Sequence, residues 1–161
     1  MRSMKRQLFR ALGHLPVPGM RGVVWHLRGL LDQTESADFE VEFAGLRYRG
    51  RLDDWIDWNV FFFGSYSPQE LDFLATAARV MGGATGGVTH FDVGANVGHH
   101  ALFMSRHVSE VVAFEPSQWA LNRFLANIRR NELDNVRVFP IALSDADGEG
   151  QLGSGFEGNS A

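Results

Sequence analysis

Cysteine is missing from this 161-residue chain, and its absence excludes several kinds of chemistry. Without thiols there is no disulfide framework, no thiolate zinc site and no cysteine nucleophile. A chain without cysteine is compatible with a cytoplasmic location, which is our expectation. The length is that of one domain and is sufficient to bury a hydrophobic core.

Long hydrophobic runs and an excess of positive charge are also absent. The formal net charge is −4, which gives no reason to expect a nucleic-acid partner. The first apolar run, Leu8 to Leu12, is too short and too interrupted for a signal peptide or a membrane span. The opening MRSMKRQLFR holds four basic residues, and a solvated helix face is favoured there over a basic amphipathic helix that binds a partner. We therefore predict no membrane span and no nucleic-acid partner.

The first half of the chain predicts helices around one β-hairpin. Apolar and polar residues alternate over 38–52 on both sides of Ala44-Gly45, which indicates two strands and a turn. Ser67 and Pro68 are typical of a helix start, and that helix is expected to end near Met81, before a glycine-rich linker or tight loop over 82–87. The other helices are expected over 4–13, 22–31 and 53–63, so that residues 1–86 form an N-terminal extension.

The second half alternates between strand and helix. Strands are predicted over 88–93, 111–114 and 136–143, the last one interrupted by Pro140, with helices over 98–107 and 118–131. This order is typical of a parallel sheet with right-handed crossovers. We therefore predict an α/β fold in which 87–152 forms the first βαβαβ half of a Rossmann-like sheet. The last residues, 153–161, are predicted to be a mobile tail.

The segment HFDVGANVGHHALF, residues 90–103, carries a strand into a glycine turn and then into a helix. Such a turn lies at the carboxyl end of its strand, where α/β sheets bind ligands. Gly94 and Gly98 have no Cβ, so a ligand can lie close to the backbone. Dinucleotide sites place a phosphate against the following helix, but Asp92 would repel a pyrophosphate there. A carboxylate at this place suits a ligand with an ammonium or sulfonium charge.

Glu115 ends the second predicted strand, 21 residues after Gly94. An acidic side chain at that place can accept hydrogen bonds from both hydroxyls of a ribose. A carboxylate for a cationic amino-acid group and another for a ribose together describe S-adenosylmethionine. The less favoured alternative is a nicotinamide-dependent oxidoreductase, which would have a third glycine and an apolar residue in place of Asp92.

Three segments, DVGANVGHHALFMS, VVAFEPSQWALNRFLANIRRNEL and NVRVFPIALSDADGEGQL, resemble the FkbM-type methyltransferases. These are class I S-adenosylmethionine-dependent enzymes, mostly O-methyltransferases of sugars and other secondary-metabolite hydroxyls. The similarity runs from about Phe91 to Leu152, with a looser echo in WIDWNVFFFGSYSPQELDFL. It implies a three-layer sandwich, S-adenosyl-L-methionine as cofactor and a small-molecule acceptor such as a glycan or glycolipid sugar.

The resemblance also implies roles for individual residues. The loop under the methionine and ribose is implied to consist of Asp92, Gly94, Ala95, Asn96 and Gly98. Glu115 is implied to bind the ribose hydroxyls, and the residues implied to lie near the adenine are Pro116, Ser117 and the Ala142-Leu143 edge. For Asn96, tying the turn is favoured over a direct hydrogen bond to the cofactor.

The sequence departs from the family in one respect. The family has a seven-stranded sheet, and this chain supplies only the first three strands, with no counterpart of the following Lys-Ile-Asp-x-Glu-Gly motif. The first strand would then be an open edge, although parallel strands are normally buried. We therefore expect a truncated or partial methyltransferase with little or no catalysis of its own. A non-catalytic cofactor-binding remnant is the alternative, and self-association through the exposed edge is expected.

The general base stays unassigned, with His99 and His100 as the candidates. Both lie in the first turn of the helix after the glycine loop, where the helix dipole disfavours the charged imidazolium and suits a base. A packing role for one and a solvated position for the other are favoured over catalysis. His90 is expected to be structural, and His107 to stabilise the helix C-terminus.

The aromatic stretch after the hairpin also has two interpretations. Helical spacing favours a core over an acceptor lid. The residues concerned are Trp55, Trp58, Phe61, Phe62, Phe63 and Tyr66. Asp53 and Asp57 lie four residues apart in the same stretch, where a solvated helix face is favoured over a metal pair. No metal is predicted.

Overall fold

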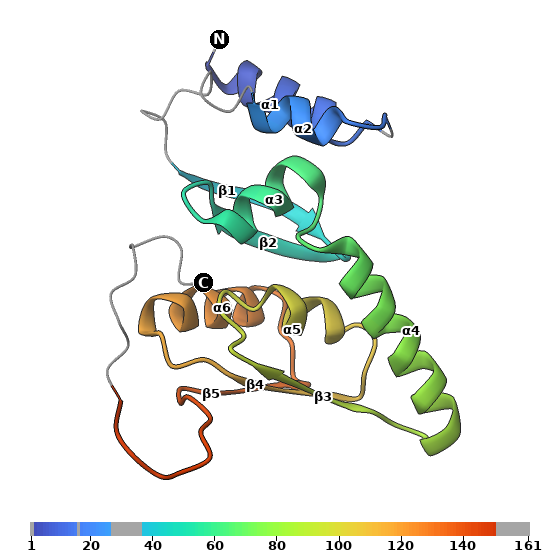
Figure 1. Cartoon of the computed structure of the whole chain (residues 1–161), viewed down its shortest axis with the longest axis vertical. Helices are drawn as coiled ribbons and strands as arrows, with labels where there is room; N and C mark the ends of the chain where they lie inside the picture. The colour runs from blue at the N-terminus through green and yellow to red at the C-terminus, as the bar shows by residue number, and fades with distance from the viewer. Residues whose placement is uncertain (1, 16, 27–36, 151–161) are drawn as a thin grey trace. The chain divides into compact units, whose positions relative to one another are not determined.

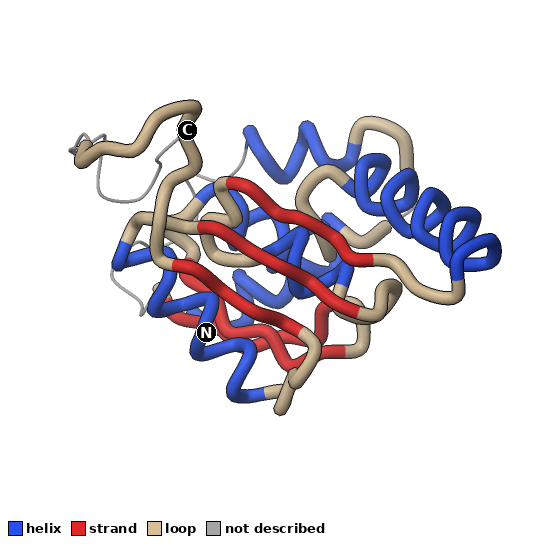
Figure 2. Tube along the Cα trace, turned by 90° about the horizontal axis from the view of Figure 1, so that it is seen from below, coloured by secondary structure: helices blue, strands red, loops and turns tan. Residues whose placement is uncertain are grey.

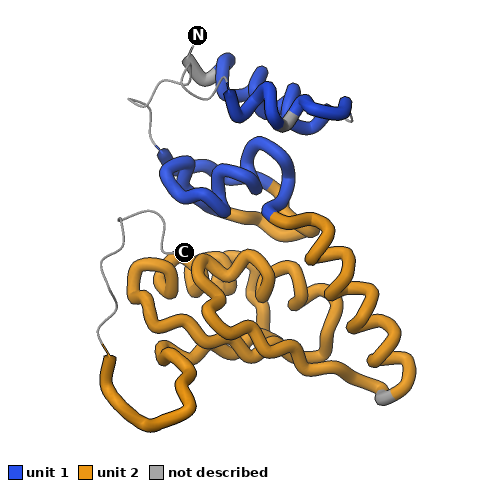
Figure 3. The backbone as a smooth tube through the Cα atoms, in the orientation of Figure 1, with its two compact units in different colours: residues 1–41, 49–66 blue, residues 42–48, 67–161 orange. Residues whose placement is uncertain are grey.

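The computed structural model describes residues 2–15, 17–26 and 37–150, which fall into two compact units (Figures 1 and 3). Unit 1 comprises residues 1–41 and 49–66, and unit 2 comprises residues 42–48 and 67–161. The tip of the N-terminal hairpin therefore belongs to the same unit as the second half of the chain. The predicted tail over 153–161 lies outside the described residues.

Unit 1 is helical around the base of the hairpin. Its elements are α1 (Arg2–Gly13), α2 (Met20–His26), α3 (Trp55–Phe63) and the parts of β1 (Asp38–Phe43) and β2 (Leu46–Arg51) that lie outside residues 42–48. Ala44 and Gly45 both have positive φ, 53° and 75°, as two-residue hairpin turns require, so the predicted hairpin is confirmed. The predicted helix over 22–31 is present as α2, and its residues after His26 lie outside the described part of the chain.

Helix α3 begins at a side-chain cap and carries the aromatic core of unit 1. The Asp54 carboxylate accepts a hydrogen bond from the Asp57 N–H at 3.0 Å, which satisfies one free donor of the first turn. Trp25 meets Trp55 and Trp58 edge-on, with ring centroids 4.7 and 5.4 Å apart. Trp58 and its neighbours Phe61 and Phe62 are buried, so the aromatic stretch provides core packing in this unit.

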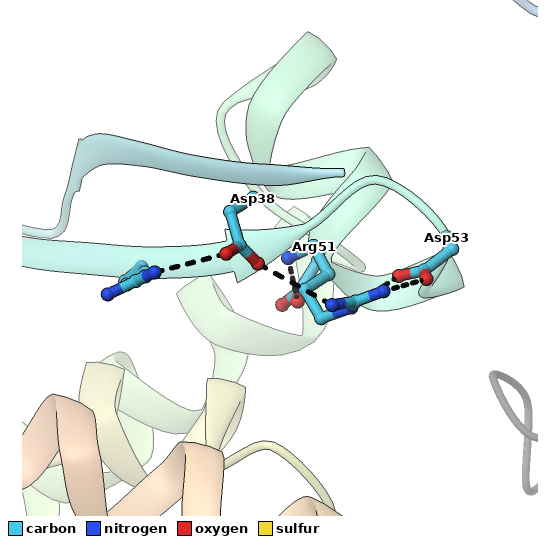
Figure 4. Close-up of polar contacts among 5 residues, drawn as sticks. Asp38, Arg51 and Asp53 are labelled. Atoms are coloured by element: carbon cyan, nitrogen blue, oxygen red, sulfur yellow. Dashed lines mark hydrogen bonds and ion pairs between the residues drawn. The ribbon is translucent and has the colours of Figure 1, made fainter. Parts of the chain in front are cut away.

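Asp57 lies in an environment that its spacing did not predict. The side chain is fully buried, and its carboxylate accepts the backbone N–H of Arg51 at 2.7 Å. The Arg51 guanidinium in turn donates to Asp53 and lies 3.7 Å from the Asp38 carboxylate (Figure 4). The expectation of a solvated face is therefore wrong for Asp57, because its carboxylate satisfies a backbone donor at the end of the hairpin.

Unit 2 contains the predicted parallel sheet. Its elements are α4 (Pro68–Thr85), β3 (Thr89–Val93), α5 (His99–Met104), β4 (Glu110–Phe114), α6 (Gln118–Arg130) and β5 (Val136–Phe139). The strand order is β3-β4-β5 with all pairs parallel, and Ala113 of β4 pairs with Asp92 on one side and Val138 on the other. Helices α5 and α6 lie on the same face of this sheet (Figure 1). The predicted α/β fold with a βαβαβ unit is confirmed.

Three predicted boundaries are wrong. The helix predicted over 98–107 ends at Met104, so His107 lies beyond it and not in its last turn. Helix α4 continues through Gly82 and Gly83 and ends at Thr85, where Gly86 caps it with a φ of 77°, so 82–85 is helical and not a loop. Glycine lowers helix propensity by about 1 kcal/mol, which a long helix tolerates. Ser67 precedes α4, but its side chain makes no capping hydrogen bond. Strand β5 ends at Phe139 instead of residue 143, because Pro140 has no N–H to extend the ladder.

The central strand and the first strand of the sheet differ in exposure. Val111 and Ala113 are fully buried in the central strand, whereas Phe91 and Val93 of β3 are 63% and 61% exposed. Figure 2 shows the three strands running side by side. Among the described strands β3 pairs only with β4, so it is an edge with apolar side chains, as the sequence predicted. In the part of the chain that the structure describes, the helices are all too short or too polar to cross a membrane.

Candidate functional site

The candidate site is formed by the loops that follow β3 and β4. Residues 94–98 leave β3 and turn back over β4, where the N–H groups of Gly94 and Ala95 both donate to the carbonyl oxygen of Phe114, at 2.9 and 3.0 Å. Gly94, Asn96 and Gly98 have positive φ values of 77°, 50° and 82°. Two glycines and an asparagine tolerate this left-handed backbone, so the motif DVGANVG encodes the turn directly.

Glu115 joins the two loops. Its carboxylate is buried and accepts the backbone N–H of Asn96 through Oε2 and that of Ser117 through Oε1, both at 2.7 Å. Its own N–H donates to the carbonyl oxygen of Phe139 at 3.0 Å, which ties β5 to the same place. Each carboxylate oxygen has two lone pairs, so capacity for hydrogen bonds from a ligand remains. Glu115 therefore organises both loops and still presents acceptor atoms.

The two glycines of the motif have different structural roles. A Cβ added at Gly94 would meet no other atom within 4 Å, so the space above this residue is open. A Cβ at Gly98 would lie 2.0 Å from Cδ2 of Phe124, a residue of α6. Gly94 therefore leaves room beside the backbone, whereas Gly98 permits close packing of the loop against α6.

Two buried acceptor atoms at this site have no hydrogen-bond partner among the described residues. They are Oδ2 of Asp92 and Oδ1 of Asn96. Burial raises the pKa of the Asp92 carboxyl, and the nearby imidazoles of His100 and His90 and a hydrogen bond from the backbone N–H of Ala101 in part oppose this increase. A buried acceptor without a donor costs free energy, and in native proteins such atoms often mark ligand sites. Both atoms require donors, so a ligand that fits here presents N–H or O–H groups.

The two histidines proposed as bases have different surroundings. His99 is 1% exposed and stacks on Phe43, with ring centroids 4.7 Å apart and planes at 25°. Burial lowers the pKa of its imidazole to about 3, with a smaller contribution from His100. The His100 side chain is 29% exposed, and its Nε2 lies 3.4 Å from Oε2 of Glu70. The geometry gives His99 a packing role and leaves His100 as the more accessible candidate.

The other predicted positions lie in different parts of unit 2. Pro116 and Ser117 connect β4 to α6, and Ser117 directly precedes that helix. Ala142 lies in the exposed segment after β5 and is outside the hydrogen-bond network described above. Burial lowers the pKa of His90, and the ring of exposed His107 packs on Phe103 at 4.6 Å.

Sequence reasoning missed two features of the site. The stacking of Phe43 on His99 was not predicted, because a strand residue so far from the motif gives no local signal. The two hydrogen bonds accepted by Phe114 were missed for a similar reason, because any residue can provide a backbone carbonyl.

Comparisons with known proteins show the fold. No protein-family model matches the sequence, and no curated protein matches it either. A S-adenosylmethionine-dependent methyltransferase from Agrobacterium tumefaciens matches 68% of this chain and 34% of its own, at 14% identity and a TM-score of 0.52. TYW2 of P. horikoshii in complex with MeSAdo matches 71% of this chain and 40% of its own, at 19% identity and a TM-score of 0.51.

These neighbours identify the class of fold. The described α/β structure is a part of the Rossmann-like class I methyltransferase fold. The chain matches between about a third and two fifths of the length of these two solved structures.

Proposed function

We propose that this chain binds S-adenosylmethionine at the loops after β3 and β4, as part of an FkbM-type methyltransferase. The proposed reaction is O-methylation of a hydroxyl on a sugar or another secondary metabolite. The observation that carries the proposal is the pair of buried, donor-seeking atoms, Oδ2 of Asp92 and Oδ1 of Asn96, beside the Glu115 carboxylate.

The chemistry of this donor set fits S-adenosylmethionine better than a dinucleotide. The α-ammonium group and the two ribose hydroxyls of S-adenosylmethionine are hydrogen-bond donors, and its sulfonium is positive. A pyrophosphate would bring only acceptors and negative charge toward Asp92. Open space at Gly94 allows a ligand to lie against the backbone. The complex of TYW2 with MeSAdo, on a similar fold, supports the same choice.

In the proposed assignment, each part of S-adenosylmethionine binds to particular residues of these loops. Asp92 holds the ammonium group, and Glu115 accepts from the ribose hydroxyls through its remaining lone pairs. The residues proposed to line the adenine are Pro116, Ser117 and Ala142. Bound S-adenosylmethionine supplies the methyl group, and the protein must hold the acceptor oxygen in line with it. His100, with Glu70 beside it, is the candidate that accepts the hydroxyl proton.

Titration calorimetry with S-adenosylhomocysteine tests the cofactor proposal. The variants are Asp92→Asn and Glu115→Gln, and Glu110→Gln is the matched control because Glu110 lies at the other end of the same strand, β4. We expect binding by the wild type and by the control, and at least tenfold weaker binding by both site variants. Binding that survives in Asp92→Asn and Glu115→Gln contradicts the assignment.

Two further measurements separate the alternatives. NAD is titrated into the same protein, and preferential binding of NAD would overturn the interpretation of Asp92. Methyl transfer from labelled S-adenosylmethionine to a panel of sugars and hydroxylated metabolites tests the proposed reaction. Binding without transfer to any acceptor favours a non-catalytic, cofactor-binding role for this chain.

A further inference from the structure

The tip of the N-terminal hairpin packs on the helix that follows the glycine loop. Phe43 is 3% exposed, and its ring stacks on the imidazole of His99 and lies 6.4 Å from the ring of Phe103. Tyr48, 1% exposed, meets Phe43 edge-on at 5.6 Å and supports it from the second strand of the hairpin. An aromatic residue from the first third of the chain therefore contacts the first turn of α5.

A second anchor joins the same tip to the end of α6. The Arg47 N–H donates to Oδ1 of Asn131, and Nδ2 of Asn131 donates back to the Arg47 carbonyl oxygen, both at 2.8 Å. These two hydrogen bonds satisfy the backbone N–H and C=O of Arg47 in the way that a neighbouring strand of a sheet would. Nη2 of Arg47 also donates to the carbonyl oxygen of Arg130 at 2.8 Å, where a cation complements the helix dipole.

These contacts surround the end of the 94–98 loop. His99 follows Gly98 directly, and Gly98 is fixed by its close packing against Phe124 of α6. The end of the loop therefore has two contacts. Gly98 packs against α6, and the next residue, His99, packs against the hairpin tip. Asn96, with its buried acceptor, lies only two residues before that point.

We propose that residues 42–48 are a structural part of the cofactor site, and that Phe43 is a positioning residue that holds the 94–98 loop through His99. The effect on ligand affinity rests on the proposed function, whereas the effect on the loop does not. Phe43 is not expected to touch the ligand. Its removal should loosen the loop before it unfolds the unit.

The experiment compares Phe43→Ala with Val111→Ala, a cavity-forming control in the amino-terminal part of β4. Hydrogen exchange of the backbone amides from residue 96 to residue 102 reports the order of the loop, and calorimetry reports affinity for S-adenosylhomocysteine. We expect at least tenfold faster exchange at these amides and at least fivefold weaker binding in Phe43→Ala. Val111→Ala should also lose stability, through its own smaller cavity, but keep the local exchange and the affinity of the wild type.

Equal exchange and equal affinity in the two variants would overturn the proposal. If Phe43→Ala does not fold, Asn131→Ala replaces it, because this change removes the second anchor of the tip and should alter both measurements in the same direction. If the wild type does not bind S-adenosylhomocysteine, the proposed function fails. The exchange of residues 96–102 then decides the positioning role alone, with faster exchange supporting it and unchanged exchange refuting it.

Discussion

Buried His99 makes the stability of unit 2 depend on pH. The imidazole stacks on Phe43, and burial lowers its pKa from 6.5 to about 3. In the unfolded chain the His99 imidazole takes up a proton near pH 6.5, whereas in the folded state it stays neutral down to about pH 3. The contribution of this group to the free energy of unfolding is therefore fully present above pH 6.5 and is lost as the pH falls toward 3. With these two values, a change from pH 7 to pH 5 removes about 2 kcal/mol of the free energy of unfolding through this one group.

Urea unfolding of the wild type and of His99→Gln, followed by circular dichroism at both pH values, measures this effect. Glutamine cannot titrate, so the stability advantage of the wild type should shrink by about 2 kcal/mol at the lower pH. His90 and Asp92 titrate in both proteins, and their contributions cancel in the comparison. His107→Gln is the matched control, because His107 is exposed and its variant should follow the wild-type curve. Parallel losses in wild type and His99→Gln would refute the argument.

Four changes at the site have further expected outcomes. The folded-state pKa of Asp92 is raised, so its contribution to stability is present below the unfolded pKa and is lost as the pH rises through the folded pKa. Asp92→Asn should therefore raise the melting temperature at pH 7 but not at pH 3. The same change should weaken ligand binding. An unchanged melting temperature at pH 7 would contradict this sign. Gly98→Ala should lower the free energy of unfolding by more than about 3 kcal/mol, because the new Cβ meets Phe124 at 2.0 Å. Gly94→Ala should lower it by only about 1 kcal/mol, through its positive φ. Equal losses in urea unfolding would exclude the packing role of Gly98. Glu115→Gln should cost about 1–3 kcal/mol, because an amide N–H₂ then faces a backbone N–H, and the free energy of unfolding without ligand measures this loss.

Much of the fold follows from local patterns in the sequence. Alternation with period two predicts the hairpin, and its turn at Ala44-Gly45 has the positive φ values that such a turn needs. The order of strands and helices after residue 87 predicts a parallel sheet, because parallel neighbours require helical crossovers. That topology places the residues after β3 and β4 at one edge, so the proximity of Asn96 and Glu115 was predictable. The assignment of these residues to a cofactor stays a prediction.

Burial and contacts between distant segments were decided by the tertiary structure alone. Aspartate at position 57 has the spacing of a solvated residue, but the end of the hairpin supplies an N–H that its buried carboxylate accepts. The low pKa of His99 depends on burial in a region where Phe43 packs against it, and no periodic signal joins these two residues. The sequence by itself determined the elements and the turn, because backbone preferences and hydrophobic period are local. Only the tertiary structure decided which polar atoms lose water, because desolvation depends on neighbours that the chain brings together in space.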